Sequence, residues 1–300
     1  MTRQTPGVRT TLARRRFLQV VAGALAGAGC SSGPGPERRA EDAGLPAPTR
    51  VPYGDHGDAF ADLWLPSDTA DPVPVVVLVH GGFWRSGFAL DLMDGLAASV
   101  ASSGWSAWNI EYRRVGAGGG FPETFDDVAA AIDHLAEVDA PLDLERVAFV
   151  GHSAGGHLAV WAASRSSLET GTDWADPQVR PRLAVAQAGV LDLVACAETG
   201  LGGGACPDLL GGSPGDVADR YARTSPVDLV PAAAPVFAVH GTADGNVPLS
   251  QTERYVAAAE AVGADVRVQI VDGADHFDVI DPRHESWSVV LDELRLVFEA

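Results

Sequence analysis

The segment Gly151-His152-Ser153-Ala154-Gly155 places a serine between two glycines, directly after a short β-branched run and before an apolar stretch. A serine on a tight turn between a strand and a helix stands clear of the backbone, with its oxygen at the head of the helix. Such a hydroxyl can attack a carbonyl carbon if a neighbouring base takes its proton. The segment therefore predicts Ser153 as a catalytic nucleophile. The alternative is a glycine-rich turn that carries an inert serine.

A second glycine-rich turn, His80-Gly81-Gly82-Phe83-Trp84, follows another β-branched run. Loops of this kind direct backbone N–H groups at the oxygen that becomes negative during acyl transfer. We expect the oxyanion donors to be the N–H groups of Gly82, Phe83 and Ala154. We also expect Trp84, Phe83 and Phe88 to line the acyl side of the substrate pocket, although core packing is an alternative for any one of these aromatic side chains.

A serine nucleophile needs a base, and the base needs a carboxylate that orients it. His276 follows the predicted strand Val266–Val271, and Asp244 follows the predicted strand Pro235–Val239. Their order after the serine, acid first and then histidine, is the order found in hydrolases with this type of turn. We therefore assign His276 as the base and Asp244 as the acid, with Asp192 as the rival acid.

Strands alternate with helical patterns along the rest of the chain. Apolar runs predict strands, and residues spaced three and four apart predict helices between them. This alternation predicts an α/β protein with a mostly parallel sheet and helices on both faces. The predicted strands are 74–79, 105–112, 146–150, 183–187, 235–239 and 266–271.

Together these motifs resemble the α/β-hydrolase superfamily over residues 51–300. Tyr112-Arg113-Arg114, Phe121-Pro122 and Asp126-Asp127 are similar to the Tyr-Arg-Leu, Phe-Pro and Asp positions of its esterase branch. That branch includes carboxylesterases, acetyl-xylan and feruloyl esterases and kynurenine formamidases. In this superfamily a lid element is inserted between sheet strands, and we expect a short lid at 193–221.

The resemblance implies a serine hydrolase that cleaves small carboxylic esters through an acyl-enzyme, without a metal or an organic cofactor. Two alternatives stay open. One is an amide hydrolase, either an arylformamidase or a small peptidase, because the same triad serves both bonds. The other is a non-catalytic lipoprotein that uses the fold to bind a ligand.

The N-terminus has the pattern of an export signal. Residues 1–29 contain five Arg and no acidic residue, and a 13-residue apolar run starts at Phe17. That run is shorter than the roughly 20 residues of a membrane-spanning helix. The paired arginines resemble a twin-arginine signal, and Gly27-Ala28-Gly29-Cys30 resembles a lipobox.

These patterns predict three regions: a signal peptide at 1–29, a lipidated Cys30 with a flexible tether at 30–50, and a hydrolase domain at 51–300. We expect the protein at the outer face of the cell membrane, held only by its lipid. The alternative is an ordinary cleaved signal and a freely secreted protein.

Composition narrows the remaining functions. The 300 residues carry a net charge of −19, and such a surface repels nucleic acid. All 21 basic residues are Arg, which excludes a lysine nucleophile and a Walker-type phosphate loop. With Cys30 lipidated, Cys196 and Cys206 form an even pair in an oxidising compartment, so we predict a disulfide between them. The alternative is two buried free thiols.

Overall fold

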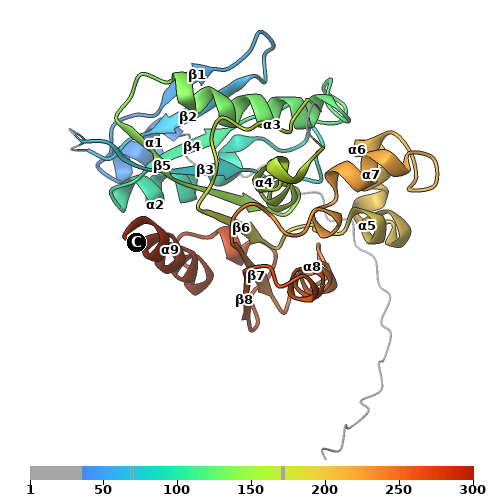
Figure 1. Cartoon of the computed structure of the whole chain (residues 1–300). Helices are drawn as coiled ribbons and strands as arrows, with labels where there is room; N and C mark the ends of the chain where they lie inside the picture. Colours follow the sequence, from blue (N-terminus) through green and yellow to red (C-terminus); the bar gives the residue numbers. More distant parts are fainter. Residues whose placement is uncertain (1–35, 68, 70, 170–172) are drawn as a thin grey trace, which may run out of the picture. The chain divides into compact units, whose positions relative to one another are not determined.

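An eight-stranded sheet forms the centre of the protein in the computed structural model, which describes residues 36–67, 69, 71–169 and 173–300 (Figure 1). The strand order is β1-β2-β4-β3-β5-β6-β7-β8. The β1–β2 and β2–β4 pairs are antiparallel, and all other pairs are parallel. The strands are β1 (Thr49–Pro52), β2 (Phe60–Trp64), β3 (Val73–Val79), β4 (Ser106–Ile110), β5 (Leu142–His152), β6 (Leu183–Gln187), β7 (Val236–Gly241) and β8 (Val266–Val271).

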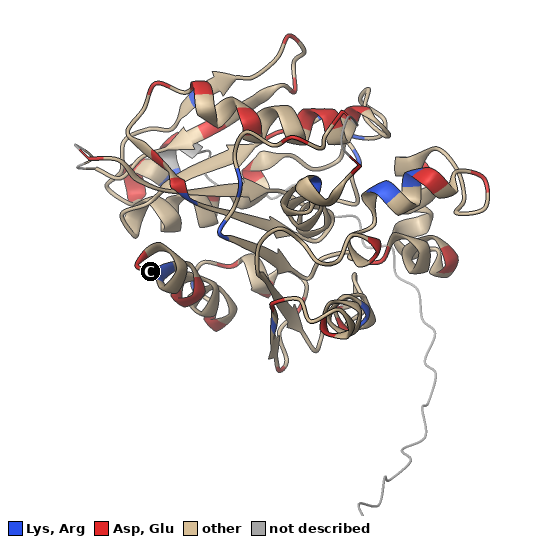
Figure 2. Ribbon diagram, in the orientation of Figure 1, with Lys and Arg blue, Asp and Glu red and all other residues tan. Residues whose placement is uncertain are grey.

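Helices cover both faces of this sheet, as the alternating pattern predicted. The α-helices are α1 (Pro36–Asp42), α2 (Asp94–Ser102), α3 (Glu123–Asp133), α4 (Ala154–Ala163), α5 (Leu193–Thr199), α6 (Ala205–Leu210), α7 (Ala218–Thr224), α8 (Ser250–Ala261) and α9 (Glu285–Phe298). Acidic residues recur along α3 and α9 (Figure 2), in keeping with the negative net charge.

Strand β3 shows why the central strands read as unbroken apolar runs. Val75, Val77 and Val79 pack into a cluster with side chains of α3, α4 and α8. Val76 and Leu78 pack into a second cluster with side chains of α1, α2 and α9. Both faces of the strand are buried, so neither set of alternating positions tolerates polar side chains.

The edge of the sheet formed by β1 and β2 was not predicted. These two strands carry charged residues, and Arg50 on β1 donates two hydrogen bonds to Asp62 on β2, at 2.8 and 2.9 Å. Strand β1 is the edge strand and is mostly exposed, so its sequence lacks an apolar run. Strand β2 is buried, but Asp62 interrupts its apolar residues.

The prediction of a flexible tether up to residue 50 is wrong from Pro36 onward. Helix α1 contacts α2, and Ala40 is fully buried in the cluster that includes Trp64 and Trp105. Leu45 packs against the same cluster. The segment needs no large apolar residues, because the Ala40 methyl group and the Leu45 side chain are enough to cover the apolar surface of this cluster. The predicted signal peptide and Cys30 lie outside the described residues.

The predicted lid between β6 and β7 consists of the short helices α5, α6 and α7 (Figure 1). A disulfide joins Cys196 on α5 to Cys206 on α6, with Cα atoms 6.2 Å apart.

Among the helices of the described residues, none has both the length and the apolar composition of a membrane span.

Candidate active site

Ser153 lies at the sharp turn between β5 and α4, in a backbone conformation that a serine rarely adopts. Its φ and ψ angles are 56° and −118°, a strain that costs on the order of 1–3 kcal/mol. A Cβ atom on Gly151 would lie 2.0 Å from the carbonyl oxygen of Gly155, and one on Gly155 would lie 2.0 Å from that of Val79. Both glycines are therefore required by close backbone packing. The Ser153 N–H donates to the Gln187 carbonyl at 2.8 Å, which helps to hold the turn.

His276 and Asp244 are directly paired. The His276 Nδ1 lies 2.7 Å from Asp244 Oδ2. A carboxylate only accepts hydrogen bonds, so Nδ1 carries the proton and, in the neutral ring, Nε2 is left as a free acceptor. The other carboxylate oxygen, Oδ1, accepts from the backbone N–H groups of Asn246 and Val247, each at 2.8 Å. The carboxylate is thus fixed from both sides.

The environment of Asp244 keeps it ionised. Burial raises the pKa of this carboxyl group, but hydrogen bonds from His240, His276 and the Val247 backbone outweigh burial and hold the pKa well below its ordinary value. His240 Nε2 lies 3.3 Å from Asp244 Oδ2, and His240 is itself anchored by Thr252 and by the Val247 carbonyl. Asp244 therefore presents a negative charge to the Nδ1 side of the His276 ring.

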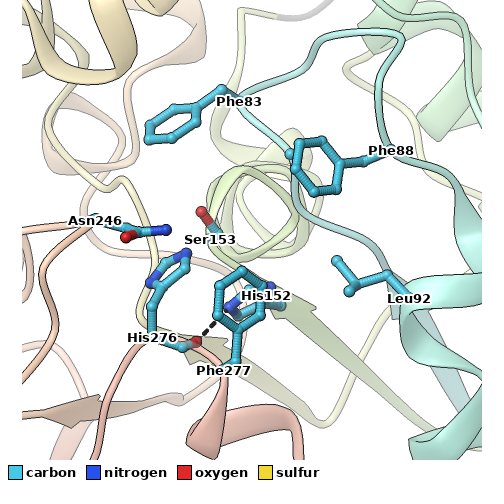
Figure 3. A pocket seen from close by; sticks show the side chains of 9 residues that line it. Phe83, Phe88, Leu92, His152, Ser153, Asn246, His276 and Phe277 are labelled. Carbon is cyan, nitrogen blue, oxygen red and sulfur yellow. Dashed lines mark hydrogen bonds between the residues drawn. The ribbon is translucent and has the colours of Figure 1, made fainter. Parts of the chain in front are cut away.

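Ser153 and His276 line one open pocket of about 270 Å³. Figure 3 shows the serine hydroxyl and the His276 ring pointing into it. Most of the remaining lining is apolar, and Phe88 and Phe277 are 42% and 48% exposed. The lining residues are Gly82, Phe83, Phe88, Leu92, His152, Ser153, Asn246, His276 and Phe277.

The predicted oxyanion donors border the same site. Gly82 has a φ of +116° and Phe83 a φ of +53°, so the loop turns sharply beside Ser153. Within the described residues, the backbone N–H groups of Gly82, Phe83 and Ala154 have no hydrogen-bond acceptor. Ala154 is also the first residue of α4, where the helix dipole favours negative charge. Free N–H groups beside a nucleophile are suited to bind an oxyanion.

The prediction that Trp84 lines the pocket is wrong. Trp84 is fully buried in the core cluster, and its indole N–H donates to His157 Nδ1 at 3.2 Å. Phe83 and Trp84 both have positive φ angles, which turn the chain so that Phe83 faces the pocket and Trp84 faces the core. Phe83 and Phe88, which were expected beside Trp84, do line the pocket, and Phe277 joins them.

His152, the residue before Ser153, is bound to the loop that carries His276. Its Nε2 donates to the His276 carbonyl at 2.9 Å, and its ring centre lies 4.5 Å from that of His276. Burial, with a further contribution from His276, lowers the pKa of His152 to about 3. The neutral ring therefore supports the loop that carries His276.

The rival acid Asp192 has a different role. Its Oδ1 accepts a hydrogen bond from the Ala195 N–H at 2.8 Å and so caps the N-terminus of α5. Its other oxygen lies 3.7 Å from Arg254. The structure brings Asp244, not Asp192, to His276.

Asn246 lies in the pocket lining, whereas the motif residue Arg113 lies outside it. Asn246 lines the pocket beside His276 (Figure 3) and was missed by sequence reasoning, because its only signal was its place two residues after Asp244. The motif residue Arg113 forms a bidentate pair with Asp127, at 2.7 and 2.9 Å. That pair joins α3 to the loop after β4 and lies outside the pocket lining.

In the portion of the chain described, no cluster of His, Cys, Asp and Glu is arranged to hold a metal ion.

Comparison with known proteins agrees with this geometry. A profile of the BD-FAE family matches residues 61–258. The chain belongs to the BD-FAE family. Among solved structures, a truncated carbohydrate esterase from gut microbiota superposes with a TM-score of 0.73 at 20% identity, covering 84% of this chain and 96% of that one. Esterase B from Lactobacillus rhamnosis, inhibited by a tributyrin phosphonate, superposes with a TM-score of 0.72 at 19% identity, covering 87% and 89%. This BD-FAE chain therefore has the α/β-hydrolase fold.

Curated relatives carry two kinds of name. Kynurenine formamidase of Danio rerio is 25% identical over 240 residues, which cover 77% of this chain and 75% of that protein. The probable carboxylic ester hydrolase LipM of Mycobacterium tuberculosis is 29% identical over 273 residues, covering 76% and 61%. The BD-FAE chain thus spans about three fifths of the length of this mycobacterial relative.

Proposed function

We propose that this protein is a serine hydrolase of carboxylic esters, with Ser153 as nucleophile, His276 as base and Asp244 as the orienting acid. One observation carries the proposal. Ser153, on a strained turn at the head of α4, shares a pocket with a histidine whose Nδ1 is bound to a buried carboxylate. The esterase names of relatives and of superposed structures support the ester as substrate.

In the first half of the reaction, Ser153 Oγ attacks the carbonyl carbon while His276 Nε2 takes the hydroxyl proton. The N–H groups of Gly82, Phe83 and Ala154 bind the oxygen as it becomes negative. Losing one donor of this kind costs on the order of 10²–10³ in rate. The ionised Asp244 stabilises the imidazolium that forms on His276.

His276 then returns its proton to the leaving alcohol, whose departure completes the acyl-enzyme. In the second half, His276 takes a proton from water as the water attacks the acyl carbon, and it returns that proton to Ser153 Oγ as the acid is released. Because the same nitrogen serves both steps, the leaving group must lie on the side of the pocket occupied by His276. Asn246 borders that side, and its side chain points into the pocket (Figure 3). The phenylalanine lining favours an apolar acyl group.

The decisive test compares p-nitrophenyl acetate hydrolysis by wild type and Ser153→Ala, with Ser164→Ala as control. Ser164 lies at the far end of α4, where its hydroxyl bonds only to the Val160 carbonyl. Ser153→Ala should lower kcat by roughly 10⁴-fold or more, and a fluorophosphonate probe should label wild type and Ser164→Ala only. Turnover that survives in Ser153→Ala would refute the proposal.

A second candidate is amide hydrolysis, which the formamidase names of relatives favour. The same serine and histidine serve that reaction, so the pocket alone decides. The ratio of kcat/KM for an aryl formamide to that for p-nitrophenyl acetate separates the two activities. A protein that neither labels nor turns over any ester or amide would instead be a non-catalytic ligand binder.

We also propose that the mature protein is exported and carries lipid at Cys30. The arginine-rich start, the short apolar run and the small residues before Cys30 support this proposal. Mass spectrometry of the mature N-terminus distinguishes a lipidated Cys30 from a free N-terminus created by ordinary signal cleavage.

A further inference from the structure

The loop that carries two of the proposed oxyanion donors contains an unfavourable turn. The Arg85 N–H donates to the Gly82 carbonyl at 3.0 Å and closes the turn. Its two central residues, Phe83 and Trp84, have φ angles of +53° and +55°, as in a type I′ turn. Glycine and asparagine prefer this conformation, and larger residues keep it only where neighbouring structure holds them. The contacts of this turn therefore decide where the N–H groups of Gly82 and Phe83 point.

One set of contacts comes from the core. The Trp84 indole N–H donates to His157, and the Val115 N–H donates to the Trp84 carbonyl at 2.8 Å. These contacts hold the second half of the turn. They do not touch Phe83, whose N–H group borders the pocket.

The second set of contacts comes from the lid. We call Gly200–Gly204, which connects α5 to α6, the glycine loop. The Arg85 guanidinium donates to the carbonyls of Gly202 and Gly203, at 2.7 and 3.1 Å, and to Asp208 on α6 at 2.7 Å. One arginine thus joins the end of the turn to the glycine loop and to the following helix.

Phe83 itself packs on the same loop. A Cβ atom built on Gly202 would lie only 2.5 Å from Phe83 Cδ1, so the ring rests directly against the backbone of Gly202. The Cys196–Cys206 disulfide ties together the two helices on either side of the loop. The lid contributes no residue to the pocket lining, yet it braces the ring that lines it.

We propose that Arg85 is a positioning residue and that the disulfide-closed glycine loop holds the oxyanion donors in place through Arg85 and Phe83. This inference rests on the proposed function. The lid then acts on the rate of the chemical step through the backbone of the Gly82–Arg85 turn, rather than by contact with substrate.

The sharpest test compares Gly202→Ala with Gly203→Ala. Both glycines have left-handed φ angles, +61° and +66°, so alanine strains the two positions alike. A Cβ at Gly203 meets no atom within 4 Å, whereas a Cβ at Gly202 must displace Phe83. Gly202→Ala should lower kcat for p-nitrophenyl acetate by roughly 10- to 100-fold relative to Gly203→Ala, part of the effect of losing an oxyanion donor. Melting curves of both variants check that Gly202→Ala stays folded when Phe83 moves.

Arg85→Ala supplies an independent test, with Arg295→Ala as control. Arg295 also forms an exposed ion pair, with Asp292 at 2.8 Å on α9, but lies outside the pocket lining. Arg85→Ala should lower kcat at least ~10-fold with KM changed less than ~3-fold, since the donors act mainly in the transition state. A trifluoromethyl ketone, which forms a tetrahedral adduct with Ser153, should lose affinity by the same factor as kcat/KM. Arg85→Lys should restore part of the loss.

The outcomes separate the two proposals. If wild type neither turns over esters nor reacts with a fluorophosphonate, the proposed function fails. If wild type is active and Gly202→Ala equals Gly203→Ala in kcat, the positioning role of the glycine loop is refuted. A loss in Arg85→Ala that leaves inhibitor affinity unchanged would refute the role of Arg85.

Discussion

Replacing Asp244 with asparagine should nearly abolish activity while leaving the fold intact. Two backbone N–H groups, each 2.8 Å from Oδ1, face one side of this side chain, and His276 faces the other. An asparagine must place its amide oxygen toward one side and its NH₂ group toward the other. Facing the two N–H groups with the oxygen keeps two hydrogen bonds of 2.8 Å. The flipped orientation loses both and keeps only the bond from His276 and the longer contact, 3.3 Å, with His240, whose Nε2 already has the Val247 carbonyl as a closer partner. The NH₂ group therefore faces His276 Nδ1.

That orientation forces the wrong tautomer on the base. With a donor opposite Nδ1, the neutral imidazole of His276 carries its proton on Nε2 and cannot accept one from Ser153. A similar exchange in a serine protease lowers kcat about 10⁴-fold, equivalent to about 5 kcal/mol of transition-state stabilisation. We expect a loss of this order in kcat/KM for p-nitrophenyl acetate, with fluorophosphonate labelling slowed in parallel.

Asp192→Asn is the matched control for this experiment. Asp192 caps α5, and asparagine caps a helix about as well as aspartate does. Its activity should stay within about 2-fold of wild type, since a preserved cap leaves the lid in place. An Asp244→Asn enzyme that keeps more than a tenth of wild-type kcat/KM would refute the triad reasoning. A comparable loss in Asp192→Asn would show that the lid or the acid assignment has been misread.

Three predictions concern stability. Burial raises the pKa of Asp94 from 3.8 to about 7, so the folded state loses stability as the pH rises from about 4 through 7. Asp94→Asn, which keeps an acceptor for Asn109, should therefore raise the free energy of unfolding by about 4 kcal/mol at pH 8 and little at pH 4. An equal gain in urea titrations at both pH values would contradict this. Trp84→Phe removes the donor to His157 and should lower the free energy of unfolding by about 1–3 kcal/mol. An unchanged melting temperature would contradict the burial of the Trp84 indole. Ala40→Asp places a charge in the buried cluster beneath α1 and should lower the free energy of unfolding by at least ~2 kcal/mol. An unchanged free energy of unfolding would show that this segment is a loose tether.

Much of the site could be predicted because its signals are local. The turn around Ser153 needs glycines at Gly151 and Gly155, and those glycines are visible in the sequence. The strands that precede Asp244 and His276 are buried on both faces or rich in β-branched residues, so their bounds were predicted to within one or two residues. In a parallel sheet, the loops after the strands lie along one edge, so the sequence predicts that Ser153, Asp244 and His276 lie close together.

Other features were decided only by packing. Phe83 and Trp84 are adjacent aromatic residues with nothing in their sequence to separate them, and two left-handed φ angles send one to the pocket and the other to the core. Likewise, Ala40 and Leu45 carry no signal of their own, and they are buried because α2 and its neighbours present an apolar surface that they complete.

The sequence by itself predicted the six strands from β3 to β8, the turn at Ser153 and the pairing of Asp244 with His276. Composition and periodicity depend on neighbouring residues, so they predict local structure and the chemistry of local motifs. Only the tertiary structure decided that Arg85 meets Gly202, 117 positions away, and that His240 joins His276 at one carboxylate. Such contacts depend on how closely separate segments pack and on which backbone carbonyls are left free to accept, and neither property is written in any local pattern.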